Sequence, residues 1–369
     1  MPNLPDAIEI DFLPVGTGNR SGDAIAMRYR RNGIESVMIY DGGTQDSGAA
    51  LIQHVRNHYG TNRVDHVVNS HPDNDHASGL SLVLEQMEVG ALWIHRPWAY
   101  SKLLSGYFAD PRYTPEGLAR RFKDNMSAAH TLEKVATTRR IPIYEPYQGA
   151  SIGAFVVLSP ERNWYLHTLV PAFEKTPDAK KTSAARQPLL GALSMALGNA
   201  VENANTYLDE HWGIEQLREG VTTSAENDSS VVMAADFDGQ RVLLTGDAGT
   251  EALHRAANYT EAIGHTLTTT SFLQVPHHGS RNNVTPSVLD RIAGVRQSSA
   301  TNAKTAFVSA SKESSTHPRK MVVNAFIRRG AKVIPTQGQT INWRHNYPSR
   351  GWQAATPLEF SPRVEAWQD

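Results

Sequence analysis

The pattern of apolar and polar positions predicts an alternation of strands and helices along most of the chain. Apolar residues that alternate with polar ones, or form short runs bounded by turn residues, predict strands. In the first half these strands cover residues 8–15, 24–30, 35–43, 64–69, 141–146 and 154–160. Apolar residues at helical spacing predict helices over residues 49–59, 78–87 and 114–138. This order of elements predicts a mixed α/β fold.

The alternation is interrupted once and resumes near Ser229. Within the interruption, the apolar spacing of residues 189–212 predicts a helix, preceded by a polar, exposed segment. The tail from Thr336 holds three tryptophans and is expected to pack on the body. We therefore expect an N-terminal half, a helical insertion, and a C-terminal half with its tail, over residues 1–160, 161–225 and 226–369.

Composition narrows the class of protein. No apolar run approaches the roughly 18 residues that span a bilayer, so no membrane association is expected. The first residues lack a basic and an apolar signal segment, which favours the cytoplasm. The absence of cysteine leaves His, Asp, Glu, Asn and backbone oxygen as metal ligands. Because 36 Lys and Arg balance 37 Asp and Glu, any affinity for phosphate must be local.

The densest group of ionisable side chains directly follows the predicted strand that ends at Asn69. It is the segment His-Pro-Asp-Asn-Asp-His, residues 71–76. Side chains at alternate positions of an extended loop project to one side, so His71, Asp73 and Asp75 can converge. His76 then faces a neighbouring site. Two adjacent metal ions fit this geometry.

Seven further short motifs lie along the chain. They are SGDAIAMRY, MIYDGG, AFVVLSP, NDSSVVM, RVLLTGD, LQVPHHGS and VSASKESSTHP. With the His-x-Asp-x-Asp-His segment, the set resembles the metallo-β-lactamase fold, and this variant of the segment is similar to the hydrolase domain of the ComEC competence proteins. The resemblance covers about residues 1–100 and 150–335. It implies a four-layer αββα metallo-β-lactamase sandwich, here with a helical insertion.

The resemblance also implies a site for two divalent ions. The matching metal ligands are His71, Asp73, Asp75, His76, Asp247 and His278. The first two match one ion, the next two and His278 match the other, and Asp247 matches the carboxylate that bridges both. His278 precedes Gly279 as the ligand does in the motif, so His277 is placed to orient it or to contact substrate.

Two departures from the family pattern affect the metal. Many members have His where Asp73 stands, and a carboxylate favours Mn or Mg relative to Zn without excluding Zn. We therefore expect two divalent ions, Zn or Mn, with Mg possible. The histidine expected shortly before the TGD strand is missing, and Glu226-Asn227-Asp228 occupies that region. Asn227, Asp228 or water could complete the first site.

Other residues are candidates for orientation and catalysis. Asp41, before two glycines, is expected to orient the His-rich loop through hydrogen bonds. His317 lies at a predicted helix start, where it could receive a phosphate or a developing oxyanion, the alternative being a helix cap. With Asp75 and His277 it completes the candidate catalytic set. Cations expected near the rim are Arg281, Lys312, Arg319 and Lys320.

These residues predict a metal-dependent hydrolase of phosphodiester bonds, acting by attack of a hydroxide that bridges the two ions. Its substrate would be nucleic acid or a small, cyclic nucleotide. One alternative keeps the fold and hydrolyses a lactone, a thioester or another small ester. Another is a non-catalytic module that binds a partner. The insertion at residues 161–225 is a candidate protein-binding surface or substrate cover, and the sequence does not fix the oligomeric state.

Overall fold

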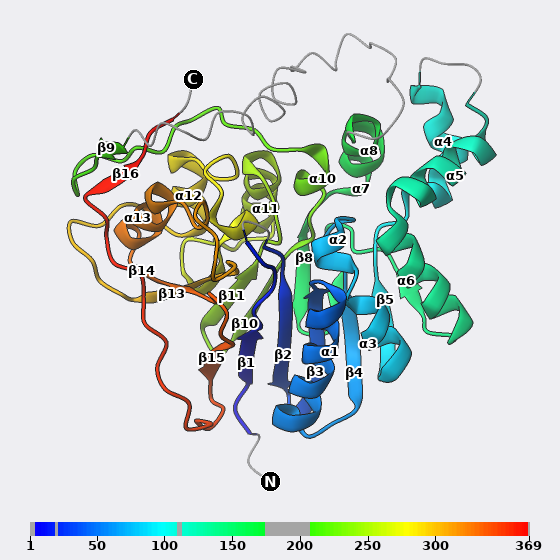
Figure 1. Ribbon diagram of the computed structural model, residues 1–369, viewed down its shortest axis with the longest axis horizontal. Coiled ribbons are helices and arrows are strands. Elements are labelled where there is room, and N and C mark those ends of the chain that lie inside the picture. Colours follow the sequence, from blue (N-terminus) through cyan, green and yellow to red (C-terminus); the bar gives the residue numbers. More distant parts are fainter. Residues whose placement is uncertain (1–3, 19–20, 109–112, 174–206, 368–369) are drawn as a thin grey trace.

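Two large β-sheets pack face to face with helices on their outer sides in the computed structural model (Figure 1). The structure describes residues 4–18, 21–108, 113–173 and 207–367. The four-layer αββα sandwich predicted from the sequence is confirmed.

The first sheet has the strand order β15-β1-β2-β3-β4-β5-β6. Its strands are β1 Ala7–Phe12, β2 Ala24–Arg31, β3 Ile34–Gly42, β4 Arg63–Val68, β5 Glu88–Trp93, β6 Ile143–Tyr144 and β15 Ile341–His345. Strands β3 to β6 run parallel, whereas β15 and β2 pair antiparallel with β1. All of β1 is buried because both neighbouring strands and both sheet faces are covered. Part of the tail thus joins the body as a strand, as expected.

The second sheet has the strand order β14-β13-β12-β11-β10-β8-β7. Its strands are β7 Ser151–Ile152, β8 Phe155–Ser159, β10 Val232–Phe237, β11 Gln240–Leu244, β12 Thr270–Gln274, β13 Lys304–Val308 and β14 Ala331–Pro335. Strands β10 and β11 form an antiparallel hairpin, and β11 to β14 run parallel.

Aromatic rings fill the space between the two sheets. Phe12 of the first sheet meets Phe307 of the second edge-to-face, with ring centroids 5.4 Å apart. Phe272 lies 5.0 Å from Phe307 in the same type of contact. Such pairs add about 0.5–1.5 kcal/mol each to the stability that comes from burial of their area. This packing holds the two sheets, and hence the loops at their ends, in fixed register.

Helices cover the outer faces. The first sheet is covered by α1 Gln45–His54, α3 Leu80–Gln86 and α6 Ser127–Thr138, while α5 Pro115–Asn125 packs on α6 and α4 (Figure 1). The second is covered by α11 Thr250–Ala262, α12 Pro286–Ile292 and α13 Lys320–Arg328. Shorter helical elements are η1 Val55–Tyr59, α2 Asn74–Ala77, η2 Pro97–Tyr100, α4 Ser101–Leu104, η3 Ser105–Tyr107, α7 Arg162–Trp164, η4 Tyr165–Leu169, α8 Val170–Ala172, α10 Ala225–Asp228 and η5 Pro276–Gly279. No helix among the described residues is long and apolar enough to cross a bilayer.

The region of the expected insertion is described only in part. Elements α7, η4 and α8 are helical, whereas residues 174–206 lie outside the described residues, and with them most of the helix expected over 189–212. The last residues of that expected helix instead form a strand, β9 Tyr207–Asp209, which pairs with β16 Arg363–Glu365. The hydrogen bonds of this pairing with the tail override the local helical periodicity. Buried Arg328 contacts Glu210 and fastens the same segment to α13.

The ends of the parallel strands meet at one edge of the sandwich. Asp41 ends β3, and the His-rich segment follows β4. The loops after β11, β12 and β13 belong to the second sheet and lie against the same edge. This edge is where open α/β sheets usually place their ligands.

Candidate metal centre

The His-rich segment changes direction sharply after β4. Residues 69–73 lead into the short helix α2, which begins at Asn74 with Asp73 at its N-cap. Asp75 and His76 therefore lie on a helical turn, and the extended loop expected from the alternation of ligands is wrong. The helix forms because the extended backbone of Asp73 allows its carbonyl to accept the first helical hydrogen bonds, from His76 and Ala77.

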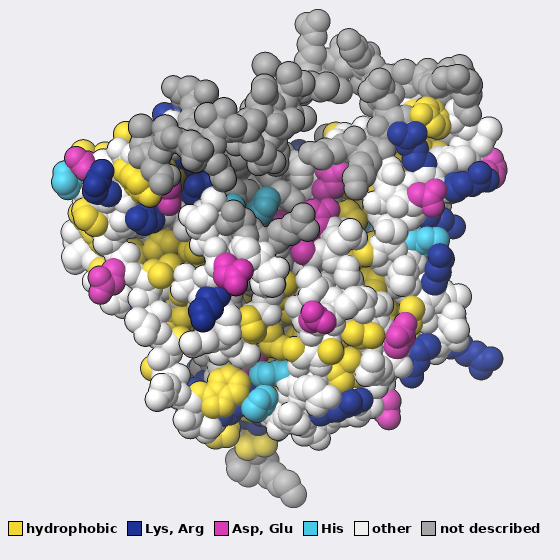
Figure 2. All heavy atoms as spheres, viewed as in Figure 1, with side chains coloured by type: hydrophobic (Ala, Val, Ile, Leu, Met, Phe, Trp, Pro, Cys, Tyr) yellow, Lys and Arg dark blue, Asp and Glu magenta, His cyan; other side chains and the backbone are white. Residues whose placement is uncertain are grey.

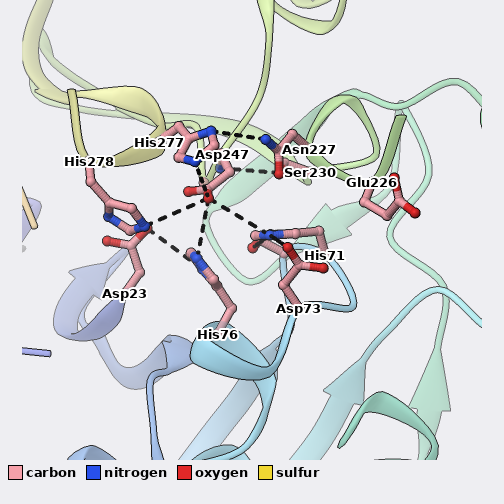
Figure 3. Close-up of polar contacts among 12 residues, drawn as sticks. Asp23, His71, Asp73, His76, Glu226, Asn227, Ser230, Asp247, His277 and His278 are labelled. Atoms are coloured by element: carbon pink, nitrogen blue, oxygen red, sulfur yellow. Dashed lines mark hydrogen bonds and ion pairs between the residues drawn. The ribbon is translucent and has the colours of Figure 1, made fainter. Parts of the chain in front are cut away.

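The carboxylate of Asp247 lies at the centre of four imidazoles (Figure 3). Its Oδ2 is 3.4 Å from Nε2 of His76 and 3.9 Å from Nε2 of His71. From the loop after β12, His277 and His278 place their Nε2 atoms 3.8 Å and 3.7 Å from the same oxygen. The structure thus brings together predicted ligands that are as much as 207 residues apart, counted from His71 to His278.

The remaining predicted ligands lie at the edges of this group. Asp73 places Oδ2 3.6 Å from Nε2 of His71, with a half-exposed side chain. Asp75, His76 and His278 have ligand atoms within 4.8 Å of one another. Each side of Asp247 therefore offers its own set of donors to a cation.

Hydrogen bonds on the far side of each imidazole fix its orientation. Oδ2 of Asp41 lies 2.9 Å from Nδ1 of His76, while the hydroxyl of Ser70 lies 2.9 Å from Nδ1 of His71. The same Asp41 accepts hydrogen bonds from the backbone N–H and the hydroxyl of Ser70. Asp41 thus acts from behind the ligands, as expected, and leaves the Nε2 atoms facing the centre.

Buried polar atoms without partners mark the centre as a place for a cation. Nε2 of His71, Nε2 of His76 and Oδ1 of Asp247 are buried and have no hydrogen-bond partner among the described residues. Such orphaned groups cost about 1–3 kcal/mol each unless something else satisfies them. Imidazole and carboxylate are ligands of Zn²⁺ and Mn²⁺, so these residues fit a divalent metal site.

Asp23 is a buried carboxylate of this centre that the sequence analysis did not single out. Its ligand atom, with those of His76 and Asp247, forms a further group within 4.8 Å. Nε2 of Gln274 donates to Oδ2 of Asp23 at 2.8 Å. Gly22 brings Asp23 close, because a Cβ at Gly22 would lie 2.1 Å from the carbonyl oxygen of Asp75. Asp23 lies in the SGDAIAMRY motif, but no other ligand-type residue is near it in the sequence, so its place in the centre is revealed by the fold.

The crowding of charges shifts the pKa values of these groups. Burial raises the pKa of Asp23 to about 7, and the nearby carboxylates of Asp247 and Asp41 add to the rise although His76 opposes it. Burial would also raise the pKa of Asp247, but the imidazoles of His76, His277 and His278 hold it well below its usual value.

The two residues that the sequence offered in place of the missing histidine have different surroundings. Asp228 accepts a hydrogen bond from the backbone N–H of Gly249 at 3.1 Å and so supports the start of α11. The side-chain amide of Asn227 lies 2.9 Å from Nδ1 of His277 and 2.7 Å from the hydroxyl of Thr223. Asn227 thus contacts His277 at Nδ1, the ring nitrogen that faces away from Asp247.

His317 lies beside the centre, but it does not start a helix. Helix α13 begins at Lys320 with Arg319 as its N-cap, so the expected start at His317 is wrong. Pro318 packs against Gly279, where a Cβ would lie 2.5 Å from the proline ring, and this contact holds His317 near His278. Burial lowers the pKa of His317 to about 3, and His278 and Arg319 lower it further. Its imidazole is therefore neutral at pH 7.

Two of the four expected rim cations lie against aromatic rings of neighbouring segments. Arg281 donates to the carbonyl of Ala366 and stacks on Trp367, and Lys320 lies over the ring of Tyr207 beside β16. Lys312 is exposed, and Arg319 is close enough to His317 to affect its pKa. Local positive charge near the centre thus comes from fewer side chains than expected.

Comparison with known proteins matches part of the chain to one family model. Residues 20–180 match the family model of the metallo-beta-lactamase superfamily. No curated protein matches the sequence. Among solved structures, the metallo-beta-lactamase fold protein YhfI from Bacillus subtilis is similar at 8% identity, over 92% of this chain and 100% of that chain, with a TM-score of 0.40.

Two further solved structures are similar at low identity. A mutant of the CmlA beta-hydroxylase shares 12% identity, over 94% of this chain and 55% of that chain, with a TM-score of 0.41. Metallo-beta-lactamase SMB-1 shares 9% identity, over 73% of this chain and 82% of that chain, with a TM-score of 0.32. The family match itself spans the His-rich segment. Residues 20–180 of the chain therefore match the metallo-β-lactamase superfamily.

Proposed function

We propose that this chain is a metal-dependent hydrolase of phosphodiester bonds, acting on nucleic acid or on a small, cyclic nucleotide. The observation that carries the proposal is the set of four imidazole Nε2 atoms at 3.4–3.9 Å from one carboxylate oxygen of Asp247. The proposed ligands of two divalent ions, Zn or Mn with Mg possible, are His71, Asp73, Asp75, His76, Asp247 and His278. The ComEC-like order of the sequence motifs supports a phosphodiester substrate.

The residues of the centre have three proposed roles: they bind the ions, orient the imidazoles or donate a hydrogen bond to the substrate. Two divalent ions bound here would lower the pKa of a water molecule and offset the charge of a scissile phosphate. Asp41 and Ser70 hold the imidazoles of His76 and His71 with Nε2 toward the centre. His317, neutral at pH 7, can donate a hydrogen bond to an oxygen on which negative charge develops.

The surface supports a small substrate or a short stretch of a polymer. On the face seen in Figure 2, Lys and Arg side chains are scattered among Asp and Glu rather than gathered in a continuous stripe over the described residues. Polymer-binding proteins usually neutralise several phosphates with a basic stripe. A substrate recognised mainly at the metal centre therefore fits this surface best.

The test compares wild type with Asp247→Asn after loading with Mn, Zn or Mg. The substrates are single-stranded DNA, duplex DNA, RNA, a cyclic dinucleotide and bis(p-nitrophenyl) phosphate. We expect wild type to hydrolyse at least one of them. Asp247→Asn should lose more activity than the roughly 10- to 100-fold expected when only an orienting group is removed.

The matched control is Asp238→Asn. Asp238 lies in the exposed turn between β10 and β11 with φ 51°, a conformation that Asn also tolerates, so its activity should equal that of wild type. A lactone and a thioester complete the panel. If the wild type with both ions bound leaves every phosphodiester intact and hydrolyses one of these esters, the phosphodiesterase proposal is wrong.

A further inference from the structure

We propose that His277 is itself a metal ligand, which completes the site of His71 and Asp73, and that Asn227 positions it. The proposal rests on the metal centre of the proposed function but not on its substrate. It gives His277 a role different from orienting His278 or contacting substrate.

The distances to Asp247 point to shared ligation rather than to hydrogen bonding. Nε2 of His277 is 3.8 Å from Oδ2 of Asp247, which is beyond the range of a hydrogen bond. Two ligands that each lie about 2.0–2.2 Å from one tetrahedral ion are separated by about 3.4 Å. The separation therefore suits two ligands with a cation between them. Nε2 of His71 lies at the comparable distance of 3.9 Å from the same oxygen.

The donor sets on the two sides of Asp247 are unequal without His277. Asp75, His76 and His278 form one set of three, to which Asp247 adds a fourth donor. His71 and Asp73 form a set of only two, and Asp247 makes three. His277 is the remaining imidazole directed at Asp247 (Figure 3), and the proposal adds it to the second set as the fourth donor. Four protein ligands are the usual complement of a closed tetrahedral site.

The backbone takes an uncommon conformation to direct both histidines to the centre. His277 has φ 45° and ψ 52°, and His278 has φ 54° and ψ 20°. Residues other than glycine rarely adopt the left-handed region, and such conformations gather at ligand sites where the surroundings enforce them. Because the two left-handed residues are consecutive, both imidazoles reach Asp247 from one short loop.

The side-chain amide of Asn227 contacts the Nδ1 side of His277 and is proposed to set the tautomer that a metal requires. In the structure the amide nitrogen of Asn227 lies 2.9 Å from Nδ1 of His277 and donates to Oγ1 of Thr223 at 2.7 Å. The oxygen and nitrogen of an amide are assigned from such contacts. The proposal requires the opposite orientation of this amide, in which its oxygen accepts from both Nδ1–H and the threonine hydroxyl and Nε2 of His277 keeps its lone pair for the metal. Asn227 thus stands behind the ligand in the region where the family pattern places the missing histidine.

The test measures bound metal, with Mn²⁺ and Zn²⁺ as probes, by elemental analysis after equilibrium dialysis. We compare wild type, His277→Asn and His278→Asn, because Asn tolerates the left-handed backbone but is too short to reach the metal. We expect two ions per chain in wild type and one in each variant. The control His317→Ala should retain two ions.

The Asn227 variants test the positioning role separately. Asn227→Asp keeps an oxygen acceptor for Nδ1–H and should retain both ions at wild-type affinity or tighter. Asn227→Leu removes the acceptor and should weaken one site by about 10- to 100-fold. If Asn227 had only a structural role, Asn227→Asp would not restore the metal affinity that Asn227→Leu loses.

Two results overturn the proposal. One is a folded His277→Asn that binds two ions with wild-type affinity, and the other is a wild type that binds only one ion. If His277→Asn does not fold, the contrast between Asn227→Asp and Asn227→Leu decides, because equal affinities in these two variants reject the proposal. The proposed function fails by a different result, namely a two-ion wild type that hydrolyses no phosphodiester.

Discussion

Oδ2 of Asp41 lies 2.9 Å from Nδ1 of His76 in a fully buried contact. A carboxylate in this position accepts the Nδ1–H and so leaves the Nε2 lone pair free for a metal. The contact joins the end of β3 to helix α2. This contact gives Asp41 a role in orienting His76 from the side that faces away from the centre.

Asp41→Asn should therefore lower metal affinity by about 10- to 100-fold while the protein stays folded. An amide nitrogen facing Nδ1 favours the tautomer with hydrogen on Nε2, which opposes ligation. Asn fits the left-handed backbone of Asp41, which has φ 58°, so little strain is added. Titration with Mn²⁺ against a competing chelator measures the effect, and Asp238→Asn, also left-handed at φ 51°, is the control. Equal affinities in the two variants would contradict the orienting role.

Sequence reasoning found the parts of the centre that carry a local signal. His71 and His76 stand out because four ligand-type residues lie within six positions, and Asp247 and His278 because their motifs follow in order. Periodicity also predicted most strands, since buried strands have strong apolar patterns. These features depend on neighbouring residues in the sequence.

Other features depend on contacts between distant residues and had no such signal. Asp23 joins the centre through the packing of Gly22 on the carbonyl of Asp75, more than 50 residues away. The extended loop expected through Asp75 became a helical turn, because the spacing of ligands does not specify backbone conformation. Helix α13 begins three residues after His317, where Pro318 packs on the loop of Gly279 instead.

Gln274 links the loop of Asp247 to Asp23, and its removal should destabilise the fold. Its buried side chain accepts from the backbone N–H groups of Thr245 and Gly246 at 2.9 Å and 3.0 Å, and donates to Asp23. Gln274→Leu leaves two buried N–H groups unpaired, at about 1–3 kcal/mol each. We expect the free energy of unfolding in urea to fall by about 2–6 kcal/mol at pH 7. A loss below about 1 kcal/mol would show that water or a shifted backbone replaces these bonds.

Asp228 should make stability depend on pH in a defined direction. Burial raises its pKa to about 7, although the N–H of Gly249 opposes the rise. A carboxyl whose pKa is higher in the folded than in the unfolded state binds more protons when folded, so its contribution to stability falls as pH rises from about 4 to about 7. Asp228→Asn removes this titration and keeps an acceptor for Gly249.

The variant should therefore be increasingly more stable than wild type between pH 5 and pH 7, with a constant difference above about pH 8. The gain cannot exceed about 1.4 kcal/mol for each pH unit. Urea unfolding of both proteins at pH 5, 6, 7 and 8 in the presence of a chelator measures it, since metal binding would add its own pH dependence. A difference that does not change with pH would place the pKa of Asp228 near its ordinary value.

His317 tests whether a neutral imidazole beside the metal centre takes part in the chemical step. Its pKa of about 3 keeps it uncharged near pH 7, so it can act as a hydrogen-bond donor but not as a cation. If it stabilises charge that develops only in the transition state, His317→Ala should lower kcat by about 100-fold or more, with KM and bound metal little changed. Steady-state kinetics on the phosphodiester that wild type hydrolyses best, together with elemental analysis, separates the outcomes. Loss of metal in His317→Ala would make His317 a ligand. An unchanged kcat would leave His317 no part in the chemical step. Its segment would then serve only in packing, because Pro318 contacts Gly279 and holds the loop after β13 against the loop after β12.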